Sequence, residues 1–438
     1  MTMNESDGIK ILCTGDLHLG RRPTRVPSGR REFGVAYVWE KIVETAIAWR
    51  VDLVVLTGDV VDRENRYFEA MGPLEQGLRR LRDAGICTYA VSGNHDYDVL
   101  PRLNDALGGT GFHLLGRGGE WEEVVVEREG KARLRLVGWS YPSQHVERSP
   151  LSSLPAFSRE LPLVGVLHTE LDSPGSLYAP VSTEALERSG VSTWLLGHIH
   201  RPMERRTSSK GVILYPGSPQ ALHPGETGVH GPWLVEVDSA GGARVRQIPL
   251  ATLRYQKLVV DLRDVDDKEV FEVMVPGKVR EDLQRLAREQ DGLRHVVYRI
   301  ILRGRTRLHR HLKEFSEGLR EDLALSFDNL ESSIDAIRVE TSPAVDLEKL
   351  ALGHDPPGVL AGLLLEAQSG RIQESRRPLW EGLGQRLRQA HRSTPFGPLL
   401  ETGVTEKFVD DGEIREMMIR QGLSLLDEML AQKEEEGR

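Results

Sequence analysis

Cysteine is scarce in this sequence. The 438 residues include only two, Cys13 and Cys87, so a framework of disulfides of the kind that holds small secreted domains together is excluded. A soft-metal site built from thiolates is excluded for the same reason. Both cysteines lie within apolar runs typical of strands, and we therefore expect two buried thiols in a reducing compartment.

Long apolar runs and ATP-binding loops are also absent. No apolar stretch approaches the roughly 20 residues that a membrane-spanning helix needs, and the polar residues 1–10 do not resemble a secretory signal. The sequence contains no Gly-x-x-x-x-Gly-Lys-Ser/Thr loop, so any ATP hydrolysis would come from another chain. We expect a cytoplasmic protein without membrane contact, long enough for two or three domains.

Histidine, by contrast, occurs in short motifs of one kind. Four motifs place histidine or a carboxylate close to glycine, and one further histidine stands behind an apolar run. In chain order they are Gly15-Asp16-Leu17-His18, Gly58-Asp59-Val60-Val61-Asp62, Gly93-Asn94-His95-Asp96, His168 and Gly197-His198-Ile199-His200. Each could be an ordinary turn if it stood alone. Five such groups in this order favour a single site.

Each motif closely follows a short apolar run that is typical of a buried strand. The runs are Ile9–Cys13, Leu53–Leu56, Ile86–Val91, Leu163–Leu167 and Trp194–Leu196. Residues 33–49 have apolar side chains at helical spacing and predict a connecting helix. This alternation predicts an α/β fold with a mixed or parallel sheet, in which polar groups at the carboxyl ends of the strands converge on one edge.

The chemistry of these residues is suited to Mn, Fe or Zn, because imidazole and carboxylate are borderline to hard ligands. Two ions about 3.5–4 Å apart need a carboxylate that bridges them, and Asp59 is the natural bridge. The other ligands fall into two sets, Asp16, His18 and His200 for one ion and Asn94, His168 and His198 for the other. Only two of the seven ligands are charged, so the positive surplus would attract a phosphodiester oxygen. The motifs thus predict a two-metal phosphoesterase.

These motifs, with Leu19-Gly20 after the first and the segment Tyr215-Pro216-Gly217-Ser218-Pro219, resemble those of the calcineurin-like metallophosphoesterases. Within that superfamily they are most similar to the SbcD and Mre11 DNA repair nucleases, and the compact length resembles the YhaO-like bacterial exonucleases. The resemblance covers residues 1–250 well. It implies a metallophosphoesterase β-sandwich flanked by helices, with a small α+β capping domain and a helical C-terminal region.

The resemblance further implies a manganese-dependent nuclease with two divalent ions that attacks DNA ends and works with an SMC-like, coiled-coil ATPase related to SbcC. It carries over the same seven ligands and assigns His95 to contact the scissile phosphate and assist the leaving group. Asp62 departs from the archaeal and eukaryotic pattern, which has histidine there, and resembles the bacterial one. Asp62 is therefore either a catalytic group or a residue that orders its loop. A homodimer is compatible with the sequence.

The net charge of −9 argues against a nucleic-acid partner, because phosphate backbones are usually met by basic surfaces. Arginines are nevertheless concentrated near the motifs. Those after the first motif are Arg21, Arg22, Arg25, Arg30 and Arg31, and those after the second are Arg63 and Arg66. They would either position DNA phosphates at the rim of the site, above all through Arg21, Arg22, Arg63 and Arg66, or form ordinary solvated loops.

The pattern changes near Pro249. We expect a nuclease domain over residues 1–250, an α+β capping domain over 251–345 and a helical region over 346–438. Expected strands at 258–262 and 295–302 and a helix at 279–288 support the middle division. The last predicted helix, Glu413–Gln432, carries a broad apolar stripe rich in methionine, which would either pack on its own domain or bind a partner.

The leading interpretation is a metal-dependent DNA exonuclease or endonuclease in DNA end processing and repair. A phosphoesterase acting on small nucleotides or phosphoproteins could use the same residues and is the alternative. A non-catalytic scaffold on the same fold would be expected to have lost ligands, whereas all seven are present.

Overall fold

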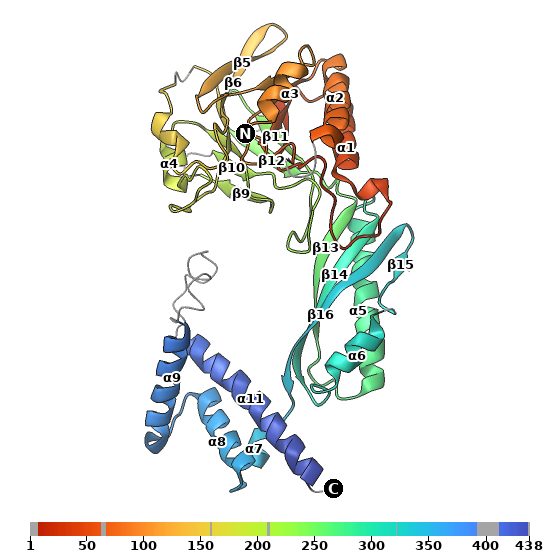
Figure 1. Cartoon of the computed structure of the whole chain (residues 1–438), viewed down its shortest axis with the longest axis vertical. Coiled ribbons are helices and arrows are strands. Elements are labelled where there is room, and N and C mark those ends of the chain that lie inside the picture. Colours follow the sequence, from red (N-terminus) through yellow and green to blue (C-terminus); the bar gives the residue numbers. More distant parts are fainter. Residues whose placement is uncertain are drawn as a thin grey trace. The chain divides into compact units, whose positions relative to one another are not determined.

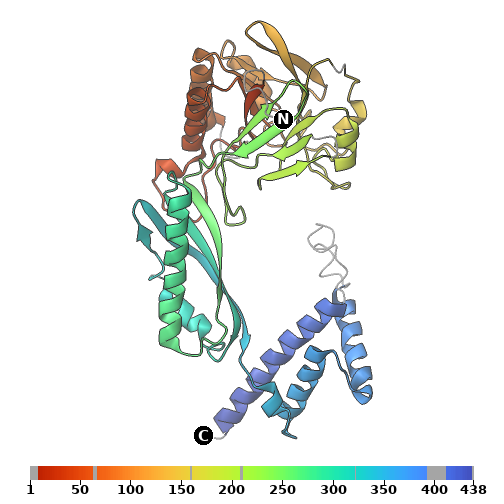
Figure 2. The ribbon, with the colours of Figure 1, turned by 180° about the vertical axis from the view of Figure 1, so that it is seen from behind.

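The computed structural model describes residues 8–62, 67–157, 160–207, 211–320, 322–391 and 411–436. The chain forms two compact units. The first comprises residues 1–258, 279–299 and 323–336, and the second comprises residues 259–278, 300–322 and 337–438. Figure 1 shows the elements in chain order, and Figure 2 shows the same ribbon from behind. The division into residues 1–250, 251–345 and 346–438 stays a prediction.

The first unit contains two six-stranded sheets, one with the order β12-β11-β1-β2-β3-β4. Its strands are β1 (Ile9–Thr14), β2 (Leu53–Leu56), β3 (Cys87–Ala90), β4 (Phe112–Leu114), β11 (Trp233–Val237) and β12 (Ala243–Gln247). Strands β1 to β4 are parallel to one another, so their carboxyl ends lie along one edge. Strand β11 pairs antiparallel with both β1 and β12, which makes the sheet mixed.

The second sheet has the order β5-β6-β7-β8-β10-β9. Its strands are β5 (Glu122–Arg128), β6 (Lys131–Trp139), β7 (Leu163–His168), β8 (Thr193–Gly197), β9 (Met203–Arg206) and β10 (Val212–Tyr215). The four inner strands are parallel, whereas β5 and β9 at the two edges are antiparallel to their neighbours. This sheet is therefore also mixed, as the sequence predicts.

A shared apolar core lies between the two sheets. It joins Ile11 and Val55 of the first sheet to Leu136, Val166 and Leu195 of the second, and none of these side chains is accessible to solvent. The inner strands are buried on both faces, which is why β2 and β7 are continuous apolar runs rather than alternating ones. The two packed sheets form the expected β-sandwich.

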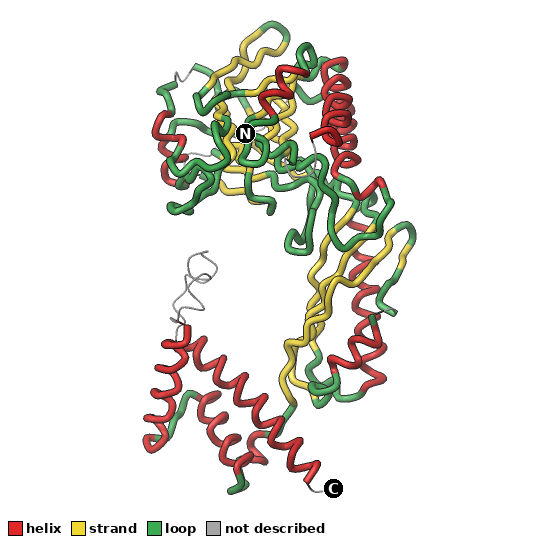
Figure 3. Tube along the Cα trace, in the orientation of Figure 1, coloured by secondary structure: helices red, strands yellow, loops and turns green. Residues whose placement is uncertain are grey.

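Helices flank the sandwich, as the red segments of Figure 3 show. Those of the first unit are α1 (Val35–Ala48), α2 (Tyr67–Asp83), α3 (Leu100–Ala106) and α4 (Thr183–Arg188). Helices α1 and α2 pack on each other and on the first sheet, in a cluster that includes Trp39, Leu12 and Leu56. The predicted connecting helix at residues 33–49 and the fold class are confirmed.

A four-stranded sheet with the order β13-β14-β16-β15 follows, and the division between the two units passes through it. Its strands are β13 (Leu253–Asp261), β14 (His295–Thr306), β15 (Ser326–Phe327) and β16 (Leu330–Pro343), and the helices beside them in sequence are α5 (Lys268–Glu289) and α6 (Leu312–Leu319). Helix α5 is longer than the predicted helix at 279–288, because the chain stays helical through Pro276.

The second unit ends in helices, as predicted. They are α7 (Leu347–Leu350), α8 (Pro356–Ser369), α9 (Arg377–His391) and α11 (Asp411–Glu436). Helix α8 begins at Pro356, where Asp355 accepts a hydrogen bond from Gly358 N at 3.2 Å.

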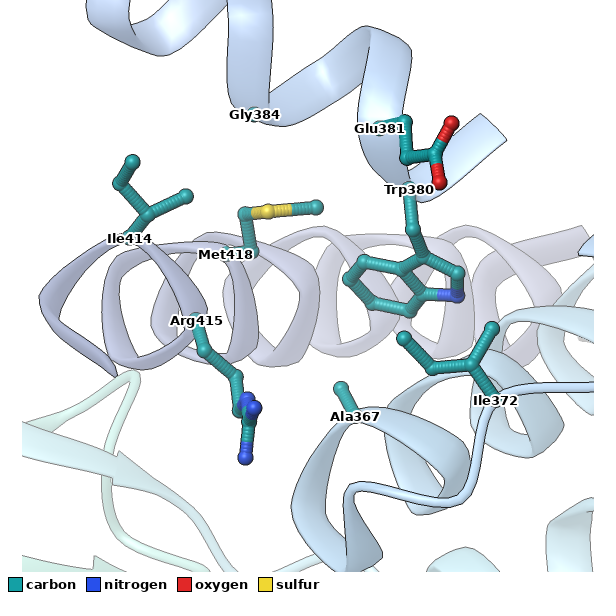
Figure 4. Close-up of a pocket in the computed structure, with 8 residues that line it drawn as sticks. All are labelled: Ala367, Ile372, Trp380, Glu381, Gly384, Ile414, Arg415 and Met418. Carbon is teal, nitrogen blue, oxygen red and sulfur yellow. The ribbon is translucent and has the colours of Figure 1, made fainter. Parts of the chain in front are cut away.

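The last helix packs within its own unit. Leu423 and Leu426 of α11 are buried in a cluster with Leu364 of α8. Beside this cluster lies a hollow of about 230 Å³, lined by residues of α8, α9 and α11 that include Trp380 and Met418 (Figure 4). The predicted apolar stripe therefore contributes to the core of the helical region.

The cysteines are only partly as expected. Cys13 is buried in β1, but the expectation of a second buried thiol was wrong, because Cys87 is exposed. Cys87 is the first residue of β3 and lies on the same face of the strand as the partly buried Tyr89, whereas Thr88 and Ala90 on the opposite face are fully buried. Within the described ranges, no helix is long and apolar enough to span a membrane.

Trp39→Ala should lower the free energy of unfolding by about 3–5 kcal/mol, because it removes a buried indole and leaves a cavity between α1, α2 and the first sheet. Trp49→Ala is the matched control. Trp49 follows α1 and is 37% exposed, so its loss should cost no more than about 0.5–1 kcal/mol. Urea unfolding followed by circular dichroism measures both variants. Equal losses would contradict this packing.

Candidate metal centre

Five loops or strand ends, each at the carboxyl end of a parallel strand, meet at one place in the first unit. Asp16 and His18 follow β1, Asp59 follows β2, Asn94 and His95 follow β3, His168 ends β7, and His198 and His200 follow β8. Ligand atoms lie within 4.8 Å of one another in three overlapping triads, Asp16-His18-His200, Asp16-Asp59-His168 and His18-Asp62-His95. The structure thus brings the predicted site residues of all five motifs together.

His168 illustrates why a cation fits here. Its Nδ1 atom lies 3.0 Å from the carbonyl oxygen of Thr57. A carbonyl oxygen only accepts, so Nδ1 carries the proton of the neutral ring and Nε2 offers a lone pair. That lone pair faces two further acceptor atoms, Asn94 Oδ1 at 3.1 Å and Asp59 Oδ2 at 3.4 Å. His198 Nδ1 lies 3.3 Å from the same Asn94 oxygen. One divalent ion would satisfy these ligand atoms together.

A second group of ligand atoms also faces Asp59. His18 Nε2 lies 3.1 Å from His200 Nε2 and 3.8 Å from Asp59 Oδ2, and His200 Nε2 lies 4.0 Å from Asp16 Oδ1. The same Asp59 oxygen thus faces histidines of both groups, as a bridging ligand must. Asp59 Oδ1 accepts a hydrogen bond from the backbone N–H of His95 at 2.9 Å, which holds the carboxylate in this orientation.

Burial sets the protonation of the centre. It lowers the pKa of His168 to about 3 and the pKa of His198 to about 4, so both imidazoles are neutral near pH 7 and can bind a metal. It also raises the pKa of Asp16 to about 7 and the pKa of Asp59 above its usual range. Buried carboxylates are costly to ionise without a partner. Two divalent cations would supply that partner, so the donor set fits them.

The backbone of the ligand loops adopts an uncommon conformation. Asp16, His18, Asp59 and His198 have positive φ angles of 47°, 47°, 48° and 102°, a region that residues other than glycine seldom enter. Such conformations persist only where the surrounding structure holds them, and they are concentrated at functional sites. Four of the seven predicted ligands lie in this region, which supports a functional origin of the strain.

Glycines make room for these side chains. An added Cβ at Gly93 would lie 2.7 Å from Cε1 of His168 and closer still to the carboxylate of Asp59. At Gly58, which has a φ of 100°, it would lie 2.5 Å from His168 Nδ1. Real Cβ atoms do not approach other atoms so closely. This close approach explains why glycine accompanies the ligands in the motifs.

Asp96 connects two of the ligand loops. One of its oxygens accepts a hydrogen bond from Gly93 N at 2.7 Å, and the other accepts one from Val60 N at 2.7 Å. The loop after β3 is thereby tied to the loop after β2. Burial raises the pKa of Asp96 to about 8, with a further rise from the charge of Asp59. Asp96 therefore supports the ligands through the backbone rather than by facing them.

Asp62 is buried beside the centre and contacts an arginine. Asp62 Oδ2 lies 3.0 Å from Arg21 Nε and 3.7 Å from His18 Nδ1. Of the two roles considered for Asp62, these contacts support the ordering of its loop, because the carboxylate holds the Arg21 side chain against the ligand loop. Arg21 itself is 37% exposed.

The arginines predicted after the first motif lie in the segment 20–36, and most residues of this segment line a hollow of about 570 Å³. Arg21 and exposed Arg22 both line this hollow. Like Arg21, which pairs with Asp62, the other three arginines of the loop pair with carboxylates: Arg25 with Asp335, Arg30 with Glu32 and Glu331, and Arg31 with Glu40. Arg63 and Arg66 lie outside the described residues.

His95 differs from the buried histidines around it. Its ring meets the ring of His18 edge-on, with the two centroids 4.9 Å apart. His18 and His168 are inaccessible to solvent, whereas His95 is partly exposed. A substrate could therefore contact His95 without displacing a ligand.

Two residues near the ligands carry no motif signal and were not predicted. Glu226 Oε1 lies 2.7 Å from His200 Nδ1, and the Tyr178 ring lies 4.8 Å from the ring of His198. Burial alone would lower the pKa of His200, but its hydrogen bond to Glu226 and the charge of Asp16 raise it to about 9. Both residues lie on irregular segments, and only the tertiary structure brings them to the centre.

Comparison with known protein families agrees with this geometry. Residues 9–202 match the calcineurin-like phosphoesterase family, and residues 255–342 match the middle domain of the metallophosphoesterase YhaO. Residues 9–202 therefore form a calcineurin-like phosphoesterase domain, and the segment that follows it is similar to the middle domain of YhaO.

Curated relatives share part of the chain. The uncharacterized metallophosphoesterase YhaO of Bacillus subtilis is 31% identical over 211 residues, which are 45% of this chain and 48% of that protein. The DNA double-strand break repair protein Mre11 of Aeropyrum pernix is 27% identical over 305 residues, which are 67% of this chain and 73% of that protein. The match thus spans about half the length of the YhaO relative. A solved dimetal phosphatase from Danio rerio is similar at 16% identity and a TM-score of 0.35, over 55% of this chain and 98% of that chain.

Gly93→Ala should weaken metal binding and lower the free energy of unfolding by about 1–3 kcal/mol, because the new methyl group overlaps Asp59 and His168. Gly175→Ala is the control, since a Cβ there meets nothing within 4 Å. Titration calorimetry with Mn²⁺ and urea unfolding measure the two effects. Wild-type metal binding by Gly93→Ala would show that the loops have more room than these distances indicate.

Proposed function

We propose that this protein is a metal-dependent nuclease that hydrolyses phosphodiester bonds of DNA in the processing and repair of DNA ends. The observation that carries the proposal is the convergence of seven ligand side chains on one place, with a partly exposed histidine beside them. Relatives named as DNA double-strand break repair proteins support DNA as the substrate.

In this proposal Asp59 would be shared by two divalent ions. Asp16, His18 and His200 would hold one ion, and Asn94, His168 and His198 would hold the other. The resemblance to SbcD and Mre11 favours Mn²⁺, and a set of imidazole, carboxylate and amide oxygen ligands suits it. When bound, the two ions supply Lewis-acid activation of the phosphate ester and of a water molecule.

His95 would contact the substrate. Its backbone N–H donates a hydrogen bond to Asp59 Oδ1 at 2.9 Å. This bond fixes the backbone of His95 and so keeps its imidazole beside the ligands. We assign this imidazole to bind the scissile phosphate and to give a proton to the leaving oxygen. Asp96 keeps the two loops together through its hydrogen bonds to Gly93 and Val60, which preserves the spacing between His95 and the ligands.

The partners proposed for this chain are DNA and an SMC-like, coiled-coil ATPase related to SbcC. Arg21 and Arg22 would contact DNA phosphates, which gives affinity and register without sequence readout. The ATPase rests on the family resemblance. Met417 and Leu425 of α11, which are 43% and 50% exposed, are apolar surface that such a partner could cover.

With Mn²⁺, the purified chain should release nucleotides from end-labelled linear duplex DNA, and a chelator should stop the reaction. His95→Ala should lower the rate at least about 100-fold, because a lost proton donor typically costs 10²–10⁴-fold. His113→Ala is the matched control. His113 is exposed and stacks on Tyr89, so its removal should leave the rate unchanged.

Two results would count against the proposal. Cleavage of a cyclic nucleotide or a nitrophenyl phosphodiester without cleavage of DNA would indicate small nucleotides as the substrate. Full activity of His95→Ala on DNA would show that His95 has no part in the reaction.

Arg22→Ala should weaken DNA binding equally for unrelated sequences and reduce the slope of log Kd against log salt concentration by about 1, because one phosphate contact is lost. Arg79→Ala serves as the control, since Arg79 pairs with Glu75 on the same face of α2. Fluorescence anisotropy of a labelled duplex over a salt series measures the slope. An unchanged slope for Arg22→Ala would exclude this contact.

A further inference from the structure

Glu226 is a buried carboxylate outside every motif, on the segment that follows β10. Its side chain is 4% exposed. Four groups surround its two oxygens. Oε1 lies 2.7 Å from His200 Nδ1 and 3.0 Å from His223 Nε2, and Oε2 accepts hydrogen bonds from Leu222 N at 2.7 Å and Ser218 Oγ at 3.1 Å. The two oxygens thus have different partners, imidazoles at Oε1 and hydrogen-bond donors of its own segment at Oε2.

The contact at Oε1 determines which nitrogen of His200 carries the proton. An ionised carboxylate only accepts hydrogen bonds, so the close contact places a proton on Nδ1 of His200. When a metal displaces the proton of Nε2, that nitrogen offers a lone pair. That lone pair faces His18 Nε2 at 3.1 Å and Asp16 Oδ1 at 4.0 Å. Glu226 therefore holds His200 in the tautomer and orientation that a metal ligand needs.

We propose that Glu226 is a positioning residue for one of the two metal sites, the one that includes His200, and that it acts through His200 without contacting the metal. The inference rests on the proposed metal centre. Carboxylates that accept the second N–H of a ligating histidine orient the ring and raise its basicity, and their loss typically weakens metal binding by about 10- to 100-fold.

A purely structural role is the competing explanation. Oε2 connects Leu222 and Ser218, and these contacts alone could keep the segment folded. The substitution Glu226→Gln separates the two roles. Leu222 N–H and the Ser218 hydroxyl both donate to one oxygen, so the amide oxygen of glutamine should occupy that position. The amide NH₂ then faces His200 Nδ1 and donates to it, which moves the proton of the ring to Nε2 and removes the lone pair from the centre.

The experiment is a calorimetric titration of the full-length, metal-stripped protein with Mn²⁺, combined with thermal unfolding of the metal-free form. The wild type should bind two ions. Glu226→Gln should bind one of them about 10- to 100-fold more weakly and the other nearly unchanged, with a melting temperature close to the wild type. Ser218→Ala is the matched control. It removes a partner of Oε2 and leaves the contact to His200, so it should lower the melting temperature without this selective loss.

Three outcomes would overturn the inference. Unchanged affinity at both sites in Glu226→Gln would show that His200 does not need the carboxylate. Equal weakening of both sites in Glu226→Gln and Ser218→Ala, with a lower melting temperature in each, would show that Glu226 only keeps its segment folded. A wild type that binds no Mn²⁺ would overturn the proposed metal centre and with it the proposed nuclease. The first two outcomes, in contrast, would overturn only the role of Glu226.

Discussion

At the centre of the first unit, buried atoms with lone pairs face one another instead of facing hydrogen-bond donors. Asn94 Oδ1 and Asp59 Oδ2 both lie within 3.4 Å of His168 Nε2. The proton of the His168 ring is on the other nitrogen, Nδ1, which donates it to the carbonyl oxygen of Thr57. Buried polar atoms without a partner are destabilising. A cation placed among them changes the sign of this interaction, so the arrangement fits a metal-binding site.

This constraint explains features that otherwise look unrelated. The ligands come from both sheets, so the apolar core between the sheets also sets the distances across the centre. The loops must bend sharply as soon as the strands end, and Asp16 and Asp59 have positive φ angles for that reason. Glycines such as Gly93 leave no side chain where neighbouring ligands pack. Asp96 then keeps the bent loops together through backbone hydrogen bonds.

The sequence predicted those parts of the centre that depend on local pattern. Each ligand lies within a few residues of an apolar strand, so strand prediction and motif spacing were sufficient to place Asp59, His168 and His198 at one edge. Glu226 could not be found in this way, because its partner His200 belongs to another loop and no spacing links them. Cys87 failed for a related reason: Tyr89 on the same face of β3 packs against the core between the sheets, but Cys87 at the start of the strand lies beyond that core, and only the tertiary structure shows where the core ends. Asp62 shows the same limit, since its pairing with Arg21 is a tertiary contact.

The two ligand sets of the centre, one with His168 and one with His200, are oriented by different kinds of group. His168 is oriented by the backbone carbonyl of Thr57, and a backbone group is present whatever side chain occupies the position. His200 is oriented by the carboxylate of Glu226, which a single substitution removes. The geometry of the His168 set therefore depends mainly on the fold of β2 and β7, whereas the His200 set depends on one side chain from a loop. Changes of sequence around the centre should consequently alter the two proposed metal sites unequally, and the site that includes His200 should be the more sensitive.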